Sequence, residues 1–328
     1  MTATAGEILW TPPLERVARS HLARFREYAA ARSGLSFADY GSLHRWSVAE
    51  PAAFWGYFAR FAGLRFQGQP RAVVEDVHAL PGARWFPGGC LSFAAHLLRV
   101  EDAGRSAQAA LIAADETGRR RELSWQALRV EVARVAAGLA ELGIGPGDRV
   151  AGLLPNGPEA VIAFLATAAR GATWSSCSPD FGVAGVLDRF GQIRPKVLFA
   201  TDGYHYGGKA IRLEANLAGV AAGLPDLRRV VLVPGLGGDG PVAEISGAIA
   251  WADFGRAGTD PGLPAQPFDH PLCILYSSGT TGPPKGILHG AGGVLIQHLK
   301  EHLLHGDLHR GDRLFYFTTC GWMMWNWL

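Results

Sequence analysis

The sequence contains few cysteines and almost no excess of charge. Only four of its 328 residues are cysteines, and they form no C-x-x-C pair: Cys90, Cys177, Cys273 and Cys320. This excludes a disulfide framework and a cysteine-type zinc site, and it is typical of a reducing compartment. The 31 basic and 29 acidic side chains leave a formal charge of +2, which is too small for a charge-driven nucleic-acid binder.

Long apolar segments are also missing from the sequence. No run approaches the ~18 uncharged residues that cross a bilayer, so we expect no membrane partner. Residues 1–13 have neither a basic leader nor an apolar core, so no secretory signal is visible. The composition, with 48% hydrophobic and 18% charged residues, is that of a globular protein. The sequence therefore predicts a soluble, cytoplasmic protein of about two domains.

Residues 1–100 are rich in aromatic side chains at helical spacings. Phe54, Tyr57, Phe58 and Phe61 follow an i, i+3, i+4, i+7 pattern, which puts four rings on one helix face. A base-stacking platform would need basic residues interleaved on that face, and the pattern has none. We expect a helix that packs on a larger body.

From about residue 107 the pattern changes to alternating strands and helices. We expect strands at 108–113, 149–154, 197–200 and 230–233, and helices at 125–142 and 159–169. This alternation predicts an α/β fold with an open, mostly parallel sheet and helices on its faces. The Gly/Pro-rich stretches 234–241 and 255–271 are the expected connectors.

The strongest functional signal is the segment 276–286, YSSGTTGPPKG, which follows a predicted buried strand at 272–275. Gly279 and Gly282 permit positive φ and let backbone N–H groups face an anion. Four hydroxyls add neutral donors around the same place: Ser277, Ser278, Thr280 and Thr281. Lys285, one of only four lysines, supplies a mobile positive charge. We therefore predict that residues 277–285, the hydroxyl-rich loop, bind a polyphosphate.

Three other motif interpretations are disfavoured. The hydroxyl-rich loop is not a Walker A loop, because Pro284 and Gly286 flank its lysine. Residues 235–240 match G-x-G-x-x-G, but prolines bracket them, so a surface loop is favoured over a dinucleotide site. Four histidines would share one face of a long helix and could hold zinc: His298, His302, His305 and His309. We expect Gly306 to interrupt that helix and see no acidic third ligand, so no metal site is predicted.

Residues 318–327, TTCGWMMWNW, form the last motif. They are either ordinary core or the wall of a small apolar pocket, and the sequence leaves both interpretations open. A pocket would be shaped by four side chains and completed by an amide that orients a polar group: Trp322, Met323, Met324 and Trp325, with Asn326. Because the sequence stops within this apolar segment, we expect it to be incomplete.

The hydroxyl-rich loop resembles the signature loop of the adenylate-forming superfamily of acyl-CoA synthetases, peptide-synthetase activating domains and luciferases. Residues 171–182 and 188–199 are similar to its acetyl- and acetoacetyl-CoA synthetase branch. Within that branch, three segments favour the acetoacetyl-CoA synthetases: 39–48, 82–88 and 320–328. Residues 91–96, LSFAAH, depart from the usual LNYAEN of the family.

This resemblance implies a fold and a reaction. The fold would be a helical N-terminal cap at 1–100, followed at 101–328 by part of the large N-terminal domain of the adenylate-forming fold, with mostly parallel sheets flanked by helices. The reaction would use ATP, Mg²⁺ and coenzyme A to convert a small carboxylic acid, with acetoacetate favoured, through an acyl-adenylate into an acyl-CoA. Thr281 and Lys285 would be catalytic, and the rest of the hydroxyl-rich loop would hold the ATP phosphates. Lys209 would contact coenzyme A.

The resemblance also implies that a part is missing. Family members are much longer, and the motifs for the adenine, the magnesium-binding acid, the ribose and the late catalytic lysine are absent here. The expected partner is therefore the missing C-terminal half of the same enzyme. Other interpretations stay open: a synthetase for acetate or propionate, a non-catalytic fragment, or, with least support, a dehydrogenase that uses the glycine run at 235–240.

Overall fold

The structure is a computed structural model that describes residues 6, 8–99, 103–236, 245, 247–256, 258, 262–277 and 282–328. The chain folds into two compact units. The first unit contains residues 1–66, 70–87 and 295–314, and the second contains residues 67–69, 88–294 and 315–328. The predicted domain boundary at residue 100 stays a prediction.

The first unit is mainly helical. Its elements are α1 (Leu14–Arg19), α2 (His21–Ser33), α3 (Tyr40–Ala49), α4 (Pro51–Phe61), the strand pair β1 (Val74–Glu75) and β2 (Arg84–Trp85), the end of α10 (Ala291–Lys300) and the π-helix η4 (Glu301–His305). The side chains of Ser20 and Asp39 begin α2 and α3 by accepting the backbone N–H groups of Ala23 and Ser42. Such caps satisfy donors that have no partner within the helix.

The predicted aromatic helix is confirmed as α4, and its rings pack against α2. Phe54, Phe58 and Phe61 lie edge-on to the ring of Phe25, with centroids 5.6, 5.7 and 5.3 Å away. Phe25 and Phe58 are completely buried. Edge-on pairs add ~0.5–1.5 kcal/mol each beyond the burial of their area. Three rings of the aromatic stripe therefore pack around the buried Phe25 in the core of this unit.

The second unit is built on a seven-stranded sheet with the order β12-β11-β8-β6-β7-β14-β15. Its strands are β6 (Arg149–Leu153), β7 (Thr173–Cys177), β8 (Val197–Thr201), β11 (Arg229–Val233), β12 (Ala248–Ala250), β14 (Pro271–Ser277) and β15 (Lys285–Gly290). Every pairing is parallel except that of β14 with β15. The predicted α/β fold with a mostly parallel sheet is confirmed.

Helices and small strand pairs surround this sheet. The helices are α5 (Phe93–Leu97), η1 (Ala103–Arg105), α6 (Trp125–Glu141), α7 (Pro158–Ala169), α8 (Val183–Ile193), α9 (Glu214–Ala222), η3 (Trp251–Asp253), the start of α10 and α11 (Met323–Trp327). The strand pairs are β3 (Cys90–Leu91) with β13 (Gln266–Pro267), β4 (Ala109–Ala114) with β5 (Arg120–Ser124), and β9 (Gly203–Tyr206) with β10 (Lys209–Arg212). The ranges expected from the sequence agree closely with β4, β6, β8, β11, α6 and α7. Among the described residues, no helix combines the length and the hydropathy that a bilayer-spanning segment needs.

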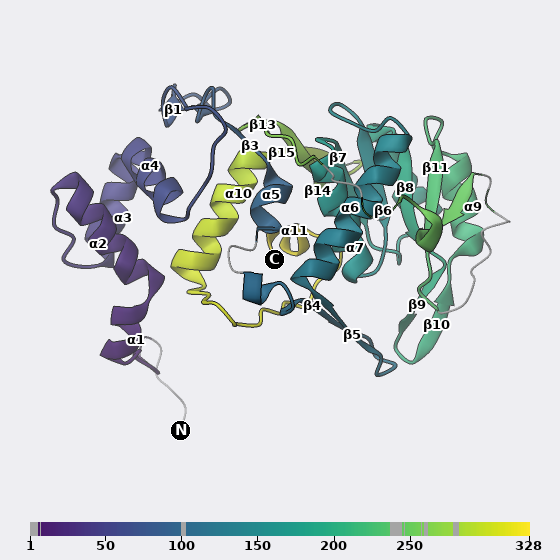
Figure 1. Cartoon of the computed structure of the whole chain (residues 1–328), viewed down its shortest axis with the longest axis horizontal. Helices are drawn as coiled ribbons and strands as arrows, with labels where there is room; N and C mark the ends of the chain where they lie inside the picture. The colour runs from purple at the N-terminus through teal and green to yellow at the C-terminus, as the bar shows by residue number, and fades with distance from the viewer. Residues whose placement is uncertain are drawn as a thin grey trace. The chain divides into compact units, whose positions relative to one another are not determined.

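The sheet is covered on both faces. On one face, Leu153 of β6 belongs to a buried cluster with Phe190 of α8 and Leu217 of α9. On the other face, the ring of Trp174 on β7 lies 6.2 Å from the ring of Phe164 on α7, and Figure 1 shows α6 and α7 crossing that face. The connections through α7 and α8 run in opposite directions along the sheet, and right-handed crossovers place such helices on opposite faces.

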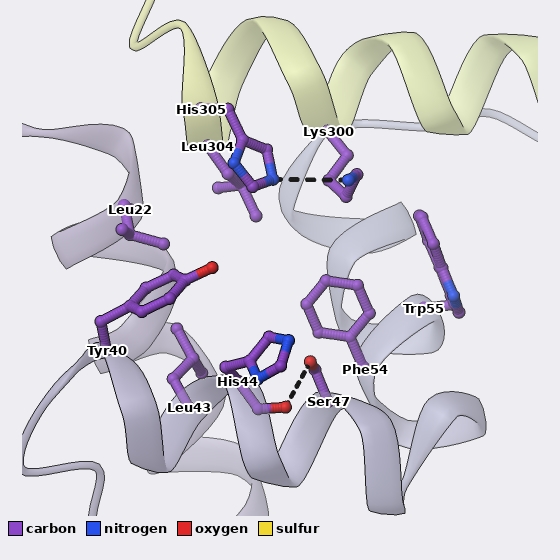
Figure 2. Close-up of a pocket in the computed structure, with 10 residues that line it drawn as sticks. All are labelled: Leu22, Tyr40, Leu43, His44, Ser47, Phe54, Trp55, Lys300, Leu304 and His305. Atoms are coloured by element: carbon purple, nitrogen blue, oxygen red, sulfur yellow. Dashed lines mark hydrogen bonds between the residues drawn. The ribbon is translucent and has the colours of Figure 1, made fainter.

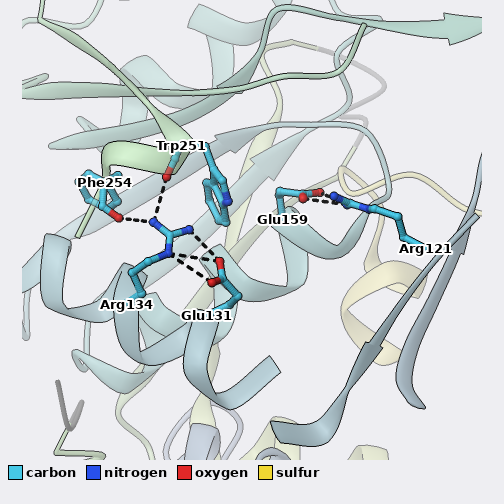
Figure 3. Close-up of polar contacts among 6 residues, drawn as sticks. All are labelled: Arg121, Glu131, Arg134, Glu159, Trp251 and Phe254. Carbon is cyan, nitrogen blue, oxygen red and sulfur yellow. Dashed lines mark hydrogen bonds and ion pairs between the residues drawn. The ribbon is translucent and has the colours of Figure 1, made fainter. Parts of the chain in front are cut away.

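A buried arginine joins α6 to the segment after β12. Nη1 of Arg134 donates to the carbonyl oxygens of Trp251, at 2.9 Å, and Phe254. Nη2 donates to Glu131 Oε2 at 2.8 Å (Figure 3). Arg134 is only 9% exposed, so water has little access to its guanidinium group. The N–H groups of this guanidinium therefore supply hydrogen bonds to buried oxygens that water would not easily supply.

The Arg134→Met variant tests this connection. Methionine keeps an apolar stem but donates no hydrogen bond, so we expect a loss of about 2–4 kcal/mol in the free energy of unfolding, measured by urea titration with circular dichroism. The control is Arg212→Gln, which removes an exposed ion pair with Glu214 and is expected to cost less than about 1 kcal/mol. Equal losses in the two variants would contradict the role of Arg134.

Candidate functional site

The carboxyl ends of the parallel strands lie along one edge of the sheet. In sheets of this kind, ligands bind outside that edge, at the point where neighbouring strands connect in opposite directions. Here β6 connects to β7 on one side, whereas β8 connects to β11 on the other. The switch between β6 and β8 therefore marks this edge as the candidate site.

The hydroxyl-rich loop leaves the sheet at this edge. Ser277, the last residue of β14, is paired with Lys285, the first residue of β15, and both are exposed. A Cβ built on Gly282 would meet no atom within 4 Å. Four predicted phosphate-binding residues lie outside the described residues: Ser278, Gly279, Thr280 and Thr281. The structure thus brings the two ends of the loop together, and the roles of its residues stay predictions.

Side-chain hydrogen bonds anchor the base of the loop. The hydroxyl of Tyr276 donates to the carbonyl of Arg189 on α8 at 2.7 Å, and burial raises the pKa of this phenol above its ordinary value. The amide of Gln192, also on α8, donates to the carbonyl of Pro284 at 2.9 Å. The residues on both sides of the loop are therefore attached to one helix.

A cavity of about 250 Å³ opens beside the switch between β6 and β8. Its walls come from the turn after β6, the ends of β8 and β11, and the β4–β5 pair. Arg121 and Glu159 on its lining form an ion pair in which Nη2 of the arginine donates to both carboxylate oxygens, at 2.7 and 2.8 Å (Figure 3). Arg119 and Asp115 form a second pair at 3.0 Å. Because each arginine has its own carboxylate, the cavity has no excess of charge that would select an anion.

The glycine run at 235–240 has a structural explanation at its first residue. The carboxylate of the buried Asp202 accepts the N–H groups of Gly235, at 2.6 Å, and Leu236, at 3.2 Å. A Cβ on Gly235 would lie 1.8 Å from the carbonyl oxygen of Gly203. Glycine is thus needed here for a close approach of two backbones. Residues 237–240 lie outside the described residues, so the surface loop expected there stays a prediction.

Lys209 lies at the start of β10, next to a tight turn. Gly207 and Gly208 form the turn with φ of +60° and +73°, and their N–H groups donate to the carboxylate of Glu116 at 2.9 and 2.8 Å. These amides already have an anionic partner. The exposed ammonium of Lys209 is therefore the group of this turn that is available to a phosphate.

The segment after residue 318 runs along the ends of β6 and β7. The hydroxyl of Ser176 donates to the carbonyl of Cys320 at 2.6 Å, and the indole N–H of Trp325 donates to Asn156 Oδ1 at 2.9 Å. The ring of Trp325 also lies 6.0 Å from that of Phe164, and this tryptophan is buried. The segment is thus anchored at the candidate site by a core tryptophan.

The other predicted pocket residues differ in exposure. Trp322 and Met323 are 66% and 59% exposed, whereas Met324 is partly buried. Asn326 has a buried Oδ1 with no hydrogen-bond partner among the described residues. The pocket role of these residues stays a prediction, and a buried acceptor without a partner can orient a bound donor. The sequence pattern missed Asn156, although its position in a turn after a strand was a usable signal.

The cysteines are unpaired, as the sequence predicts. Burial raises the pKa of the Cys177 and Cys273 thiols to about 12, and burial also raises the pKa of the Cys320 thiol. These three thiols therefore favour the protonated form near neutral pH, and a thiol is a weaker nucleophile than a thiolate.

The predicted interruption of the histidine-rich helix is confirmed. The π-helix η4 ends at His305, and Gly306 follows it. His305 lines a cavity of about 340 Å³ in the first unit, and Figure 2 shows Lys300 and His305 facing it from one side, with Tyr40 and His44 opposite. Lys300 Nζ lies 2.7 Å from Glu301 Oε1 and 3.3 Å from His305 Nε2. The lysine is thus held by the chain's own partners, and we assign no ligand to this cavity.

Comparisons with known proteins give two family matches. The AMP-binding enzyme model matches residues 100–327, and the model of the acetyl-coenzyme A synthetase N-terminus matches residues 40–97. Acetoacetyl-coenzyme A synthetase of Rhizobium meliloti is 48% identical over 98% of this chain, and acetoacetyl-CoA synthetase of Gallus gallus is 42% identical over 98% of it. Malonamoyl-CoA synthetase of Penicillium aethiopicum is 40% identical over 98% of it.

The fold matches a solved structure. Acetoacetyl-CoA synthetase from Streptomyces lividans superposes with a TM-score of 0.93 at 46% identity, over 98% of this chain and 49% of that chain. The Rhizobium and Gallus relatives are each covered over 49% of their length, and the Penicillium relative over 46%. The chain thus spans about half the length of the proteins it matches.

The Gly235→Ala variant tests the close-approach explanation. An added methyl group must displace the Gly203 carbonyl, so we expect a loss of about 1–3 kcal/mol in the free energy of unfolding. The matched control is Gly282→Ala, where the new methyl group meets open space and stability should be unchanged. Unfolding midpoints in urea that are equal for both variants would contradict the explanation.

Proposed function

The chain belongs to the AMP-binding enzyme family, and we propose on that premise that it forms the N-terminal half of an ATP-dependent acid–CoA ligase that makes acetoacetyl-CoA. The observation that carries the proposal is the hydroxyl-rich loop at the carboxyl edge of the sheet, with Ser277 and Lys285 exposed at its two ends. Similarity to acetoacetyl-CoA synthetases over 98% of the chain supports the choice of acid. The proposed architecture is a cap at 1–100 and part of an AMP-binding domain at 101–328.

The first proposed step joins the acid to AMP. A carboxylate oxygen attacks the α-phosphorus of ATP, the bond to the β-phosphate oxygen breaks, and pyrophosphate leaves. Charge builds up on the leaving pyrophosphate, where preorganised donors and a cation lower the barrier. In this proposal Lys285 and the hydroxyl of Thr281 contact the leaving group, and the other loop residues hold the phosphates.

The second proposed step transfers the acyl group to coenzyme A. The thiol sulfur attacks the carbonyl carbon of the acyl-adenylate, and AMP leaves. Lys209 is the proposed contact for a phosphate of coenzyme A, because its ammonium is exposed while the neighbouring turn amides are occupied by Glu116. Buried, protonated cysteines fit a reaction whose thiol comes from the substrate.

The family resemblance implies that Mg²⁺ binds together with ATP. Among the described residues, the second unit contains no group of three His, Cys, Asp or Glu side chains placed to hold an ion. No step is assigned to the ion. In this proposal its acidic ligand belongs to the missing half of the enzyme.

The acid pocket is proposed at residues 322–326. Asn326 is its polar group, since its Oδ1 is buried and lacks a partner among the described residues. The amide can present either its oxygen or its N–H₂ to a ligand. In the reversed orientation, which gives up the 3.4 Å hydrogen bond from Nδ2 to the Trp322 carbonyl, it would donate to the keto oxygen of acetoacetate, and in the observed orientation it would accept from an amide. The second orientation favours malonamate as an alternative acid, in line with the Penicillium relative. Acetate and propionate are further alternatives, and the proposed compartment is the cytoplasm, which suits four free cysteines.

A chimaera tests the ligase proposal. It joins residues 1–328 to the second half of the Streptomyces lividans enzyme, and its acid-dependent exchange between ATP and labelled pyrophosphate is measured. We expect exchange with acetoacetate to exceed that with malonamate, acetate or propionate. Lys285→Ala and Thr281→Ala should each lower it by about 100-fold or more, because each removes a contact to the leaving group.

The control for these variants is Arg120→Ala, which removes an exposed cation from β5 and should not change the exchange rate. A Lys285→Ala chimaera that exchanges at the unmodified rate would contradict the role of the loop. A folded chimaera that is inactive with all four acids would contradict the ligase proposal. The 328-residue chain by itself is proposed to be inactive in the same assay.

A further inference from the structure

The first unit contains a cluster of two histidines and one aspartate. His21 is the first residue of α2, and Asp307 and His309 follow η4. Each of the three offers one ligand atom, and these atoms lie within 4.8 Å of one another. We propose that His21, Asp307 and His309 bind a divalent transition-metal ion of the zinc type. None of the residues assigned to the ligase reaction belongs to this unit.

The carboxylate of Asp307 lies at the centre of the cluster. Its Oδ1 accepts the backbone N–H of His21 at 2.7 Å and lies 3.3 Å from Nε2 of His309. A charge-assisted hydrogen bond between nitrogen and oxygen is usually shorter, at ~2.7–2.9 Å. Two ligands on a tetrahedral zinc ion, with bonds of ~2.0–2.1 Å, are ~3.4 Å apart. The observed separation therefore matches two ligands of one ion better than a direct hydrogen bond.

The imidazole of His21 has a hydrogen-bond partner of the kind that histidine ligands usually have. Nε2 of His21 lies 3.1 Å from the carbonyl oxygen of Leu308. With the proton on Nε2, this hydrogen bond leaves the Nδ1 lone pair for a metal, and histidine ligands commonly donate their other N–H to a carbonyl. The rings of His21 and His309 are stacked with centroids 4.4 Å apart. To bind one ion, the two stacked rings would turn so that a nitrogen lone pair of each points at the ion beside the carboxylate.

Backbone contacts hold the ligand segment in place. The N–H of Leu308 donates to the carbonyl of His302 at 2.9 Å. The side chain of Asp312 accepts the N–H of His309 at 2.8 Å, and the N–H of Asp312 donates to the carbonyl of His309 at 3.1 Å. These bonds fix the backbone on both sides of Asp307, so little chain entropy would be lost when an ion binds.

The ligand types select the class of metal. Imidazole nitrogen suits zinc, copper, nickel and iron, whereas magnesium and calcium prefer oxygen ligands. A ligand set of two histidines and one carboxylate also occurs in zinc sites that keep a fourth position for water. The side chains of His309 and Asp307 are 43% and 27% exposed, so an ion can reach them from solvent. A bound ion would connect chain segments that are 286 residues apart in sequence, which stabilises a long closed loop.

Asp307→Asn is the most selective variant for this site. Asp307 has φ of +49°, a conformation that asparagine tolerates well, and asparagine keeps an oxygen that can accept the His21 N–H. The change therefore removes the anionic ligand with little effect on the fold. His309→Gln is the second variant. His78→Gln is the matched control, because His78 is an exposed histidine in a loop of the same unit.

The experiment is calorimetric titration of the tag-free 328-residue chain with ZnCl₂ after treatment with a chelator. We expect one zinc ion per chain, and a rise of several degrees in the thermal unfolding midpoint of the wild type and of His78→Gln. Asp307→Asn and His309→Gln should each weaken zinc binding by more than about tenfold and reduce the rise in midpoint.

Three results would overturn the proposal. One is equal zinc affinity in the wild type and in both ligand variants, and another is no zinc binding by the wild type at all. The third is an absorption spectrum of the Co²⁺ complex with sulfur-to-metal charge-transfer bands, because these would place the ion on cysteine. Circular dichroism of each variant shows whether it is folded. If one of the two ligand variants fails to fold, the zinc affinity of the other variant is the test.

Discussion

The register between β14 and its two neighbours is the constraint on which the candidate site depends. Cys273 and Ile274 pair in parallel with β7, while the other edge of β14 pairs antiparallel with β15 down to Ser277 and Lys285. The hydroxyl of Ser175 on β7 donates to the Ile274 carbonyl at 2.9 Å, which adds a side-chain bond to this pairing. A slip of one residue would turn buried side chains to the wrong face. The same pairing therefore fills the core and places the hydroxyl-rich loop at the carboxyl edge.

Much of this arrangement could be predicted from the sequence, because the signals are local. Alternating strand and helix patterns indicate a parallel sheet, and the apolar run at 272–275 indicates the strand that ends at the loop. The four-ring stripe of α4 is equally local, since residues three and four apart share a helix face. Glycine, hydroxyl and lysine within one short segment are enough to suggest phosphate binding. The helices and strands whose positions depend on local sequence patterns therefore lie where the sequence predicts them.

What could not be predicted depends on contacts between distant segments. Gly235 is required by the Gly203 carbonyl, which no local pattern reveals. Asp307 supplies the acidic partner that the histidine pattern lacked, and the second imidazole near His309 comes from His21, at the other end of the chain. The indole of Trp325 finds its acceptor, Asn156, 169 residues away. The topology of the fold brings such residues together, and a single sequence does not reveal which distant residues will be in contact.

The central claim is that the hydroxyl-rich loop binds the phosphates of ATP, and amide hydrogen exchange across residues 277–286 tests it most directly. In the chimaeric enzyme, ATP is expected to slow exchange of these amides, because their N–H groups would donate to phosphate oxygens. Adenosine, which has no phosphates, should leave their exchange rates unchanged. Equal protection by ATP and adenosine, or no protection by ATP at a concentration that saturates the enzyme, would contradict the claim.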